Sequence, residues 1–152
     1  MSTDPNVIEQ AIADHINGGT YAISFTAERV PVVTKSLKEV KGVEVVLAYE
    51  DRESTRDSRK ARNITHTIRV AVMNEAFKEI TNAVVDPLKK LVADIDARLM
   101  ATATAVLTIS GQRFVATSLA YENGFYDREA LRDQRTFVSE FTIEYLATGV
   151  EG

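Results

Sequence analysis

The chain lacks cysteine, contains only two histidines, and has no apolar run close to the roughly 20 residues that a membrane-spanning helix requires. The absence of cysteine excludes disulfides, cysteine-ligated zinc, iron–sulfur clusters and thiol catalysis. The first residues contain no basic region followed by an apolar run, so we expect no signal peptide. These absences predict a soluble protein that is made and used in the cytoplasm, with no membrane partner.

The few candidates for catalytic residues have a more ordinary structural interpretation. His15 lies in the last turn of a predicted helix, where a cation is favourable, so we interpret it as a capping residue on the surface. His66 lies between two threonines on the apolar face of a predicted strand, and we interpret it as a hydrogen-bonded core or interface residue rather than a general base. His-x-x-x-His spacing, calcium loops and phosphate-binding glycine loops are all absent. We therefore expect no metal, no cofactor and no enzymatic activity; a small α+β enzyme with a dispersed active site is an alternative.

What is present has the composition of an ordinary globular protein. Of the 152 residues, 45% are hydrophobic and 26% are charged, which predicts a single domain over residues 1–152 with a substantial core. The formal net charge of -4 provides no basic footprint for nucleic acid, although a DNA-binding module with a local basic patch is a further alternative.

Two alternating stretches, residues 43–49 and 64–73, organise the chain. Each places apolar side chains on one face, which is the period of a half-buried strand. Because the two runs follow one another directly, they predict a long antiparallel hairpin over about residues 43–73.

Two Asp-Pro pairs predict where helices begin. Asp4-Pro5 and Asp86-Pro87 each supply an N-cap followed by a residue suited to the first helical position, so we expect helices over about residues 5–17 and 86–100. Four further strands are predicted over residues 20–29, 106–109, 113–121 and 134–147. A helical turn is predicted over residues 34–40 and a loose tail over residues 148–152. The resulting fold class is α+β, a two-layer arrangement with a mainly antiparallel sheet covered on one face by the two helices.

The stretch between the hairpin strands, residues 51–62, carries five basic and three acidic residues. The default interpretation is a solvated loop with mixed charges. The sharper interpretation is a loop that contacts another subunit, another protein or DNA phosphates, for all of which arginine is suited. Because the signs are mixed and aromatic residues for base stacking are absent, we favour protein contact. The residues predicted to make this contact are Arg52, Arg56, Asp57, Arg59, Lys60 and Arg62.

The layout of the chain resembles that of a known family. An N-terminal helix ending in glycine, a first strand, the long hairpin, a long amphipathic helix and two closing strands follow one another. The hairpin itself carries Leu37-x-x-Val40-x-Gly42-Val43-x-Val45-Val46, an arginine-containing polar stretch, and Ile64-x-x-x-Ile68-x-Val70-x-Val72. This pattern, over nearly the whole chain, is similar to the tail terminator proteins of long-tailed bacteriophages and their relatives among neck and tail-completion proteins.

The resemblance implies a structural protein of the virion, located in the tail or neck and assembled in the host cytoplasm. Such proteins form a homohexameric ring that caps the finished tail tube and presents the surface that joins the head. The implied partners are further copies of the chain, the tail tube protein and a head-completion or connector protein, with DNA passing through the lumen. The family has no catalytic residues to transfer to this sequence, and another neck or connector protein is the nearest alternative.

Overall fold

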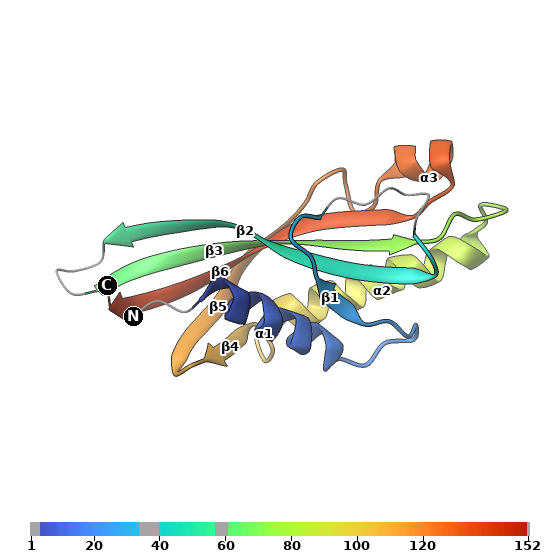
Figure 1. The fold of residues 1–152 in the computed structure, drawn as a ribbon. Coiled ribbons are helices and arrows are strands. Elements are labelled where there is room, and N and C mark those ends of the chain that lie inside the picture. Colours follow the sequence, from blue (N-terminus) through green and yellow to red (C-terminus); the bar gives the residue numbers. More distant parts are fainter. Residues whose placement is uncertain (1–3, 34–39, 57–60, 152) are drawn as a thin grey trace.

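A computed structural model describes residues 4–33, 40–56 and 61–151 of the chain. Within these ranges the helices are α1 (Pro5–Asn17), α2 (Asn82–Met100) and α3 (Arg128–Gln134). The strands are β1 (Ala27–Arg29), β2 (Val43–Arg56), β3 (Ala61–Asn74), β4 (Val106–Ile109), β5 (Gln112–Tyr121) and β6 (Val138–Glu151). They form one six-stranded sheet in the order β1-β2-β3-β6-β5-β4. The chain is therefore α+β, with α1 and α2 on one face of the sheet and α3 at one end of the other (Figure 1).

Helix α1 begins and ends as predicted. The Asp4 side chain accepts a hydrogen bond of 2.9 Å from the backbone N–H of Asn6, and Pro5 occupies the first turn. The helix ends at Asn17, and the N–H of the next residue, Gly18, bonds back to the carbonyl of Asp14. The predicted Asp N-cap and the end of the helix at this glycine are thus both confirmed. The left-handed C-cap conformation typical of glycine is not adopted, because Gly18 has φ -75°.

Helix α2 begins four residues earlier than predicted. Its N-cap is Thr81, whose carbonyl accepts hydrogen bonds from the N–H groups of Val84 and Val85, and Pro87 lies inside the helix. Proline in a helix interior removes one backbone hydrogen bond, which is why residue 86 looked like the better start. The additional turn is stabilised because Val85, only 5% exposed, extends the apolar stripe of the helix onto the core.

The hairpin is present but its strands are much longer than predicted. Strand β2 runs to Arg56 and β3 starts at Ala61, with Arg56 paired opposite Arg62, so most of the expected loop over residues 51–62 is sheet. One extra residue, Glu50, is accommodated by a β-bulge between Tyr49 and Asp51. The charged composition of this stretch concealed its strand structure.

The first predicted strand, residues 20–29, is almost entirely irregular, and the part that forms β1 pairs parallel to β2. The segment before β1 is held against α1, because the Tyr21 hydroxyl donates to the carbonyl of Ile16 and the Asn17 side chain bonds both backbone groups of Ala27. Only three residues then reach the sheet, and a crossover leads to β2. The sheet is therefore mixed rather than purely antiparallel, and the helical turn expected at 34–40 falls largely on residues 34–39, outside the described residues.

The C-terminal part differs from the prediction in two places. The charged residues 127–133, for which the sequence predicts an exposed stretch without a helix, contribute most of α3, whose first N–H groups are capped by the Asp127 side chain. The last strand, predicted from residue 134, begins at Val138 because the helix extends to Gln134. The expected loose tail is strand, because β6 continues beside β3 as far as the pair Ala61–Glu151. The strands β4 and β5 lie close to their predicted positions.

The core lies between the sheet and the two long helices. Its largest fully buried side chains include Phe114, Phe137, Phe141 and Tyr145, which pack against the apolar stripes of α1 and α2. The helices are also tied to each other, since Arg98 Nε donates to the carbonyl of His15 over 3.0 Å. The opposite face of the sheet carries only a small apolar cluster, formed by Val40, Ala71 and Met73 with neighbours, and this face is the more open one.

Candidate interaction surfaces

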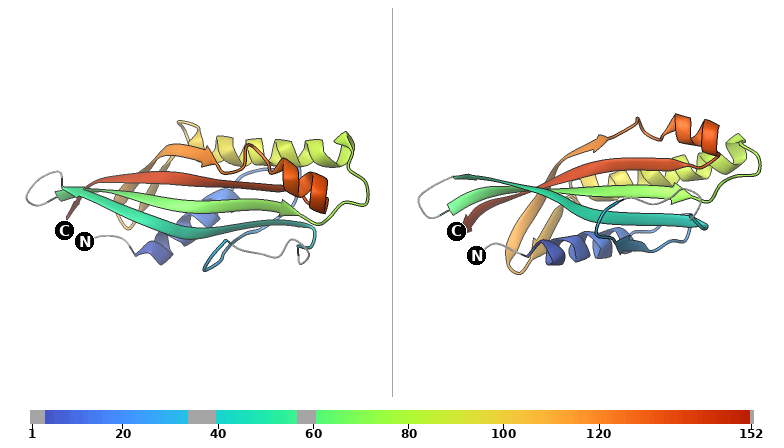
Figure 2. Two further views of the ribbon diagram at one scale, coloured as in Figure 1. Left: turned by 90° about the horizontal axis from the view of Figure 1, so that it is seen from above. Right: turned by 45° about the horizontal axis from the view of Figure 1, so that its top comes forward.

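The distal halves of β2 and β3 and the end of β6 form a three-stranded arm that extends beyond α1 and α2 (Figures 1 and 2). We define the arm as residues 51–56, 61–65 and 147–151. The arm is continuous with the body, because Ile64 and Val150 belong to the main core cluster although they lie near its end. The described part of the arm is therefore paired sheet, packed at its base on the core, and it extends away from the helices.

The bulge sorts the mixed charges of the arm onto its two faces. Arg52 lies opposite His66 and Arg56 opposite Arg62, so these arginines share the face of the sheet that carries the helices. Asp51 and Glu53 alternate with them and belong to the opposite face. The arm thus has a basic face and an acidic face, an arrangement that the sequence showed only as a mixture.

The residues predicted as contact residues have different positions. Arg52 and Arg56 are exposed, Arg62 is partly buried, and Asp57, Arg59 and Lys60 lie outside the described residues. The Nε atom of Arg62 is buried without a hydrogen-bond partner in the part of the chain that the structure describes. Because Arg56 and Arg62 are directly opposite each other, their like charges repel, and this repulsion would be relieved by a negatively charged partner.

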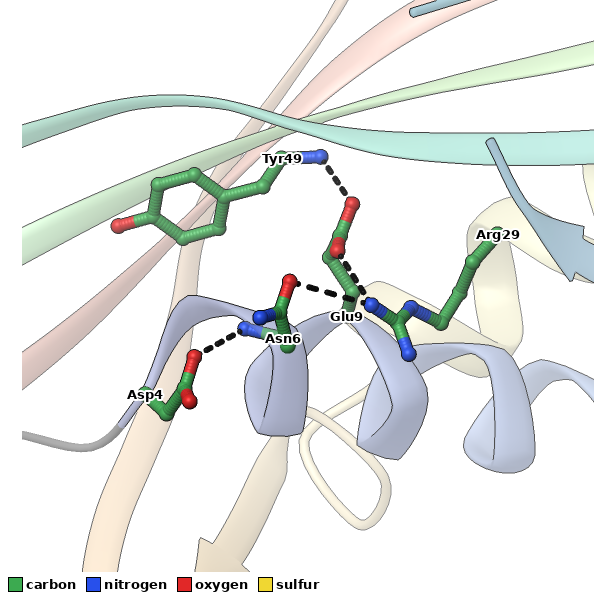
Figure 3. Close-up of polar contacts among 5 residues, drawn as sticks. All are labelled: Asp4, Asn6, Glu9, Arg29 and Tyr49. Carbon is green, nitrogen blue, oxygen red and sulfur yellow. Dashed lines mark hydrogen bonds and ion pairs between the residues drawn. The ribbon is translucent and has the colours of Figure 1, made fainter. Parts of the chain in front are cut away.

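A buried carboxylate connects the base of the arm to α1 (Figure 3). Glu9 is only 7% exposed, accepts a 2.7 Å hydrogen bond from the backbone N–H of Tyr49, and pairs with Arg29 at 3.1 Å. Arg29 also donates to the side-chain oxygen of Asn6. Beyond the end of β1, the edge of β2 has no neighbouring strand, and the Glu9 carboxylate accepts the backbone hydrogen bond of Tyr49, next to the bulge, that such a strand would otherwise accept. Sequence reasoning missed Glu9, although its position on the buried face of α1 between Ile8 and Ile12 was a signal.

His66 is a buried member of the core, as predicted. The residue is only 2% exposed. Its Nδ1 lies 2.6 Å from the Tyr49 hydroxyl oxygen, and its ring contacts the ring of Phe114. Burial, with a smaller contribution from the nearby charge of Arg52, lowers the pKa of His66 to about 4. The ring is neutral at pH 7 and structural in its contacts. His15 is likewise structural, with its Nε2 3.3 Å from the carbonyl oxygen of Arg98.

A cluster of one arginine and three carboxylates lies on the open face of the sheet. Arg69 contacts Glu50 through two nitrogens, at 2.8 and 3.0 Å, and also pairs with Glu122 at 3.0 Å and Glu140 at 3.5 Å. The pKa of Glu140 is raised, chiefly by burial and then by its acidic neighbours, against the opposing effect of Arg69. One cation thus holds together three strands and the turn after β5, with negative charge in excess.

The same open face contains a groove of about 880 Å³ between β1, the first residues of β2, the end of β3 and α3. Its floor includes Val46, Ala71, Met73 and Val138. The acidic residues lining it are Glu28, Glu44, Asp127, Glu129, Asp133 and Glu140. The described residues that line this groove include no lysine or arginine. An apolar floor with an acidic rim suits a basic or amphipathic partner.

The described residues hold no grouping of three or more histidine, aspartate and glutamate side chains arranged to bind a metal ion. None of the helices in the described ranges is long and apolar enough to cross a membrane. The notable features of this surface are therefore the arm and the groove, at opposite ends of the sheet.

No protein family model matches this chain, and a search of curated proteins finds no match of significance. The function must accordingly be argued from the geometry of these two surfaces and from the layout of the sequence.

Proposed function

We propose that this chain is a structural protein of a long-tailed phage, a tail terminator that forms a ring, caps the tail tube and presents the surface to which the head is joined. The observation that carries the proposal is the arm. It is an extension of the sheet, beyond the long helices, that presents exposed arginines and the opposed pair Arg56 and Arg62. Such a pair favours contact with an acidic partner over isolation in solvent.

The arrangement of surfaces on the chain is compatible with a ring. A ring of identical subunits requires two different complementary surfaces on each copy, placed so that rotation closes the assembly. The basic face of the arm and the acidic groove are different surfaces at opposite ends of one sheet. A protein that forms symmetric dimers would instead need one self-complementary surface.

The proposal also assigns partners. The ring would contact the tail tube protein on one side and a head-completion or connector protein on the other, and DNA would pass through its lumen. The protein would act in the virion by assembly alone, with no enzymatic activity and no cofactor.

The test is the mass of the protein in solution by light scattering, followed by negative-stain imaging with and without tail tubes from the phage that encodes it. We expect rings, or density that caps tube ends. A protein that stays monomeric and ignores tube ends would contradict the proposal. A ring that binds the connector but not the tube would place the protein elsewhere in the neck, and tight, salt-sensitive binding to duplex DNA by the monomer would favour a DNA-binding module.

A further inference from the structure

The acidic groove on the open face of the sheet has a natural occupant in the chain itself. We infer that the groove of one copy binds the basic end of the arm of the next copy, so that Arg52 and Arg56 of one subunit meet Glu28 and Glu129 of its neighbour. This inference rests on the proposed function, because it specifies the contact by which the ring would close.

The charges of the two surfaces are complementary. Six carboxylate residues line the groove; Asp133 pairs with Arg132 and Glu140 with Arg69. Glu28 and Glu129 form no ion pair among the described residues, so their charges remain available to a partner. On the face of the arm that carries the helices, the paired positions of β2 and β3 hold Arg52, Arg56 and Arg62 and no acidic residue among those described. Complementary charge fixes the register of two surfaces and suppresses incorrect pairing.

The arm can reach a groove only on another copy. From Val46, in the groove, to Arg56, at the end of β2, ten residues of strand span roughly 33 Å. The two surfaces also belong to opposite faces of the sheet. Glu28, Val46, Ala71 and Glu140 form one transverse row of paired residues on the open face, whereas the arm arginines share the face of the helices. Since distance and face both separate them, contact within one copy is excluded.

The contact also accounts for features that an isolated subunit leaves unexplained. The groove has an apolar floor that is only partly covered by α3, and residues of α3 and β1 place carboxylates at its rim. At the arm, Arg56 and Arg62 are paired directly opposite each other, so their like charges repel. Seating the arm over the groove would bring carboxylates to these guanidinium groups, as charge-assisted hydrogen bonds require.

Charge exchange between the two surfaces provides the first test. One variant, R52E/R56E, reverses the arm, and a second, E28R/E129R, reverses the groove. Each variant alone places like charges in contact, so we expect its self-association to weaken by roughly a hundredfold or more. In an equal mixture every arm can meet a groove of opposite charge when the two variants alternate. We therefore expect the mixture to regain the mass of the wild-type assembly, and alternation closes in an even-numbered ring such as a hexamer.

The matched control is K89E/K90E, which changes the net charge by the same amount as R52E/R56E but lies on α2, on the face of the sheet opposite the groove (Figure 1). It should assemble as the wild type does. Circular dichroism and urea unfolding of each variant test whether the fold is retained. We expect it to be retained, because all four substituted residues are exposed.

A second test leaves the charges at most positions intact. Because the chain has no cysteine, single-cysteine variants R56C and E129C can be mixed and treated with a short bifunctional thiol crosslinker. Any crosslinked dimer then joins two copies. We expect R56C with E129C to crosslink at least tenfold faster than R56C with the control K90C on the outer side of α2. Equal rates for the two mixtures would overturn the inference.

The outcomes separate this inference from the proposed function. If wild-type protein forms rings or caps tubes, and both charge variants do so equally well, the ring stands and the arm-in-groove contact is wrong. If wild-type protein forms no assembly, alone or on tubes, the proposed function fails and the inference fails with it. If single variants fail to assemble and their mixture does not recover, the charges act separately and the inference is also overturned.

Discussion

The hydroxyl oxygen of Tyr49 lies 2.6 Å from Nδ1 of His66, and this contact joins the two strands of the hairpin where the arm begins. His66 is almost fully buried, so its ring nitrogen has lost solvent as a hydrogen-bonding partner. The variant Y49F leaves that nitrogen without the phenol. We expect it to lower the free energy of unfolding, measured by urea denaturation, by about 1–3 kcal/mol.

The matched control removes the same atom from another buried tyrosine. The hydroxyl of Tyr145, opposite His66 on β6, is buried without a hydrogen-bond partner among the described residues. Its burial also raises the pKa of the phenol. Because Y145F removes an unsatisfied polar group, we expect no loss of stability and a gain of up to about 1 kcal/mol. If Y145F destabilised the protein as much as Y49F, the hydroxyl of Tyr145 would have a partner and the contrast between the two tyrosines would fail.

The stability of the fold should depend on pH through His66. Its pKa is about 4 when folded and 6.5 when exposed, so between these values the unfolded chain binds more protons. The contribution of His66 to the free energy of unfolding is therefore fully present above pH 6.5. It is lost as the pH falls toward 4, by about 3 kcal/mol in total. We measure the free energy of unfolding by urea denaturation at several pH values in this range. This free energy should fall less steeply with decreasing pH in H66F than in the wild type.

Histidine 15 provides the control for this pH dependence. Partial burial and the charge of Arg98 also lower the pKa of His15, but its ring is less enclosed. The variant H15Q should keep most of the pH dependence of the unfolding free energy seen in the wild type. A slope that disappears in H15Q and persists in H66F would show that His66 is not the group responsible.

Much of the body of the fold was accessible from the sequence because its signals are local. These signals depend only on residues close together in the sequence. They are the Asp4 cap, the glycines after α1 and the alternating apolar residues of β2 and β3. The identification of His66 as a buried residue followed from the same alternation. The ends of α1 were predicted correctly in this way, whereas the Asp86-Pro87 signal placed the start of α2 four residues too late.

The errors came from interactions between distant residues. The strand character of residues 51–56 depends on pairing with β3, and the bulge that places Arg52 and Arg56 on one face leaves no mark in the sequence. The parallel pairing of β1 depends on how Asn17 and Tyr21 hold the preceding segment against α1. The groove could not be predicted for the same reason, since its walls come from four separate parts of the chain.

The Arg69 cluster should make a modest, salt-sensitive contribution to stability. Arg69 contacts Glu50 through two nitrogens, which is a favourable geometry, but all the partners are partly exposed and solvent screens the charges. We expect R69M to cost about 1 kcal/mol at low ionic strength and less in molar salt. The variant K90M, which removes an exposed pair with Asp94, should cost less than R69M. Equal losses for the two variants, or a loss from R69M that salt does not reduce, would contradict this account.

Glu9 should decide how firmly the edge of β2 is held at the base of the arm. Its carboxylate accepts the Tyr49 N–H at 2.7 Å, where β1 no longer pairs with β2. Replacement by alanine leaves this backbone group without a partner beside a buried helix face, so E9A should lose about 1–3 kcal/mol of unfolding free energy. In native-state hydrogen exchange, the Tyr49 amide should exchange faster in E9A than in wild type. The variant R29Q removes the ion pair with Glu9 and the hydrogen bond to Asn6 but leaves the carboxylate in place. Because Arg29 is 36% exposed, we expect R29Q to cost less than about 1 kcal/mol while the Tyr49 amide stays protected. Unchanged exchange at Tyr49 in E9A would mean that the carboxylate does not protect the edge of the sheet, and that α1 holds the arm through apolar packing alone.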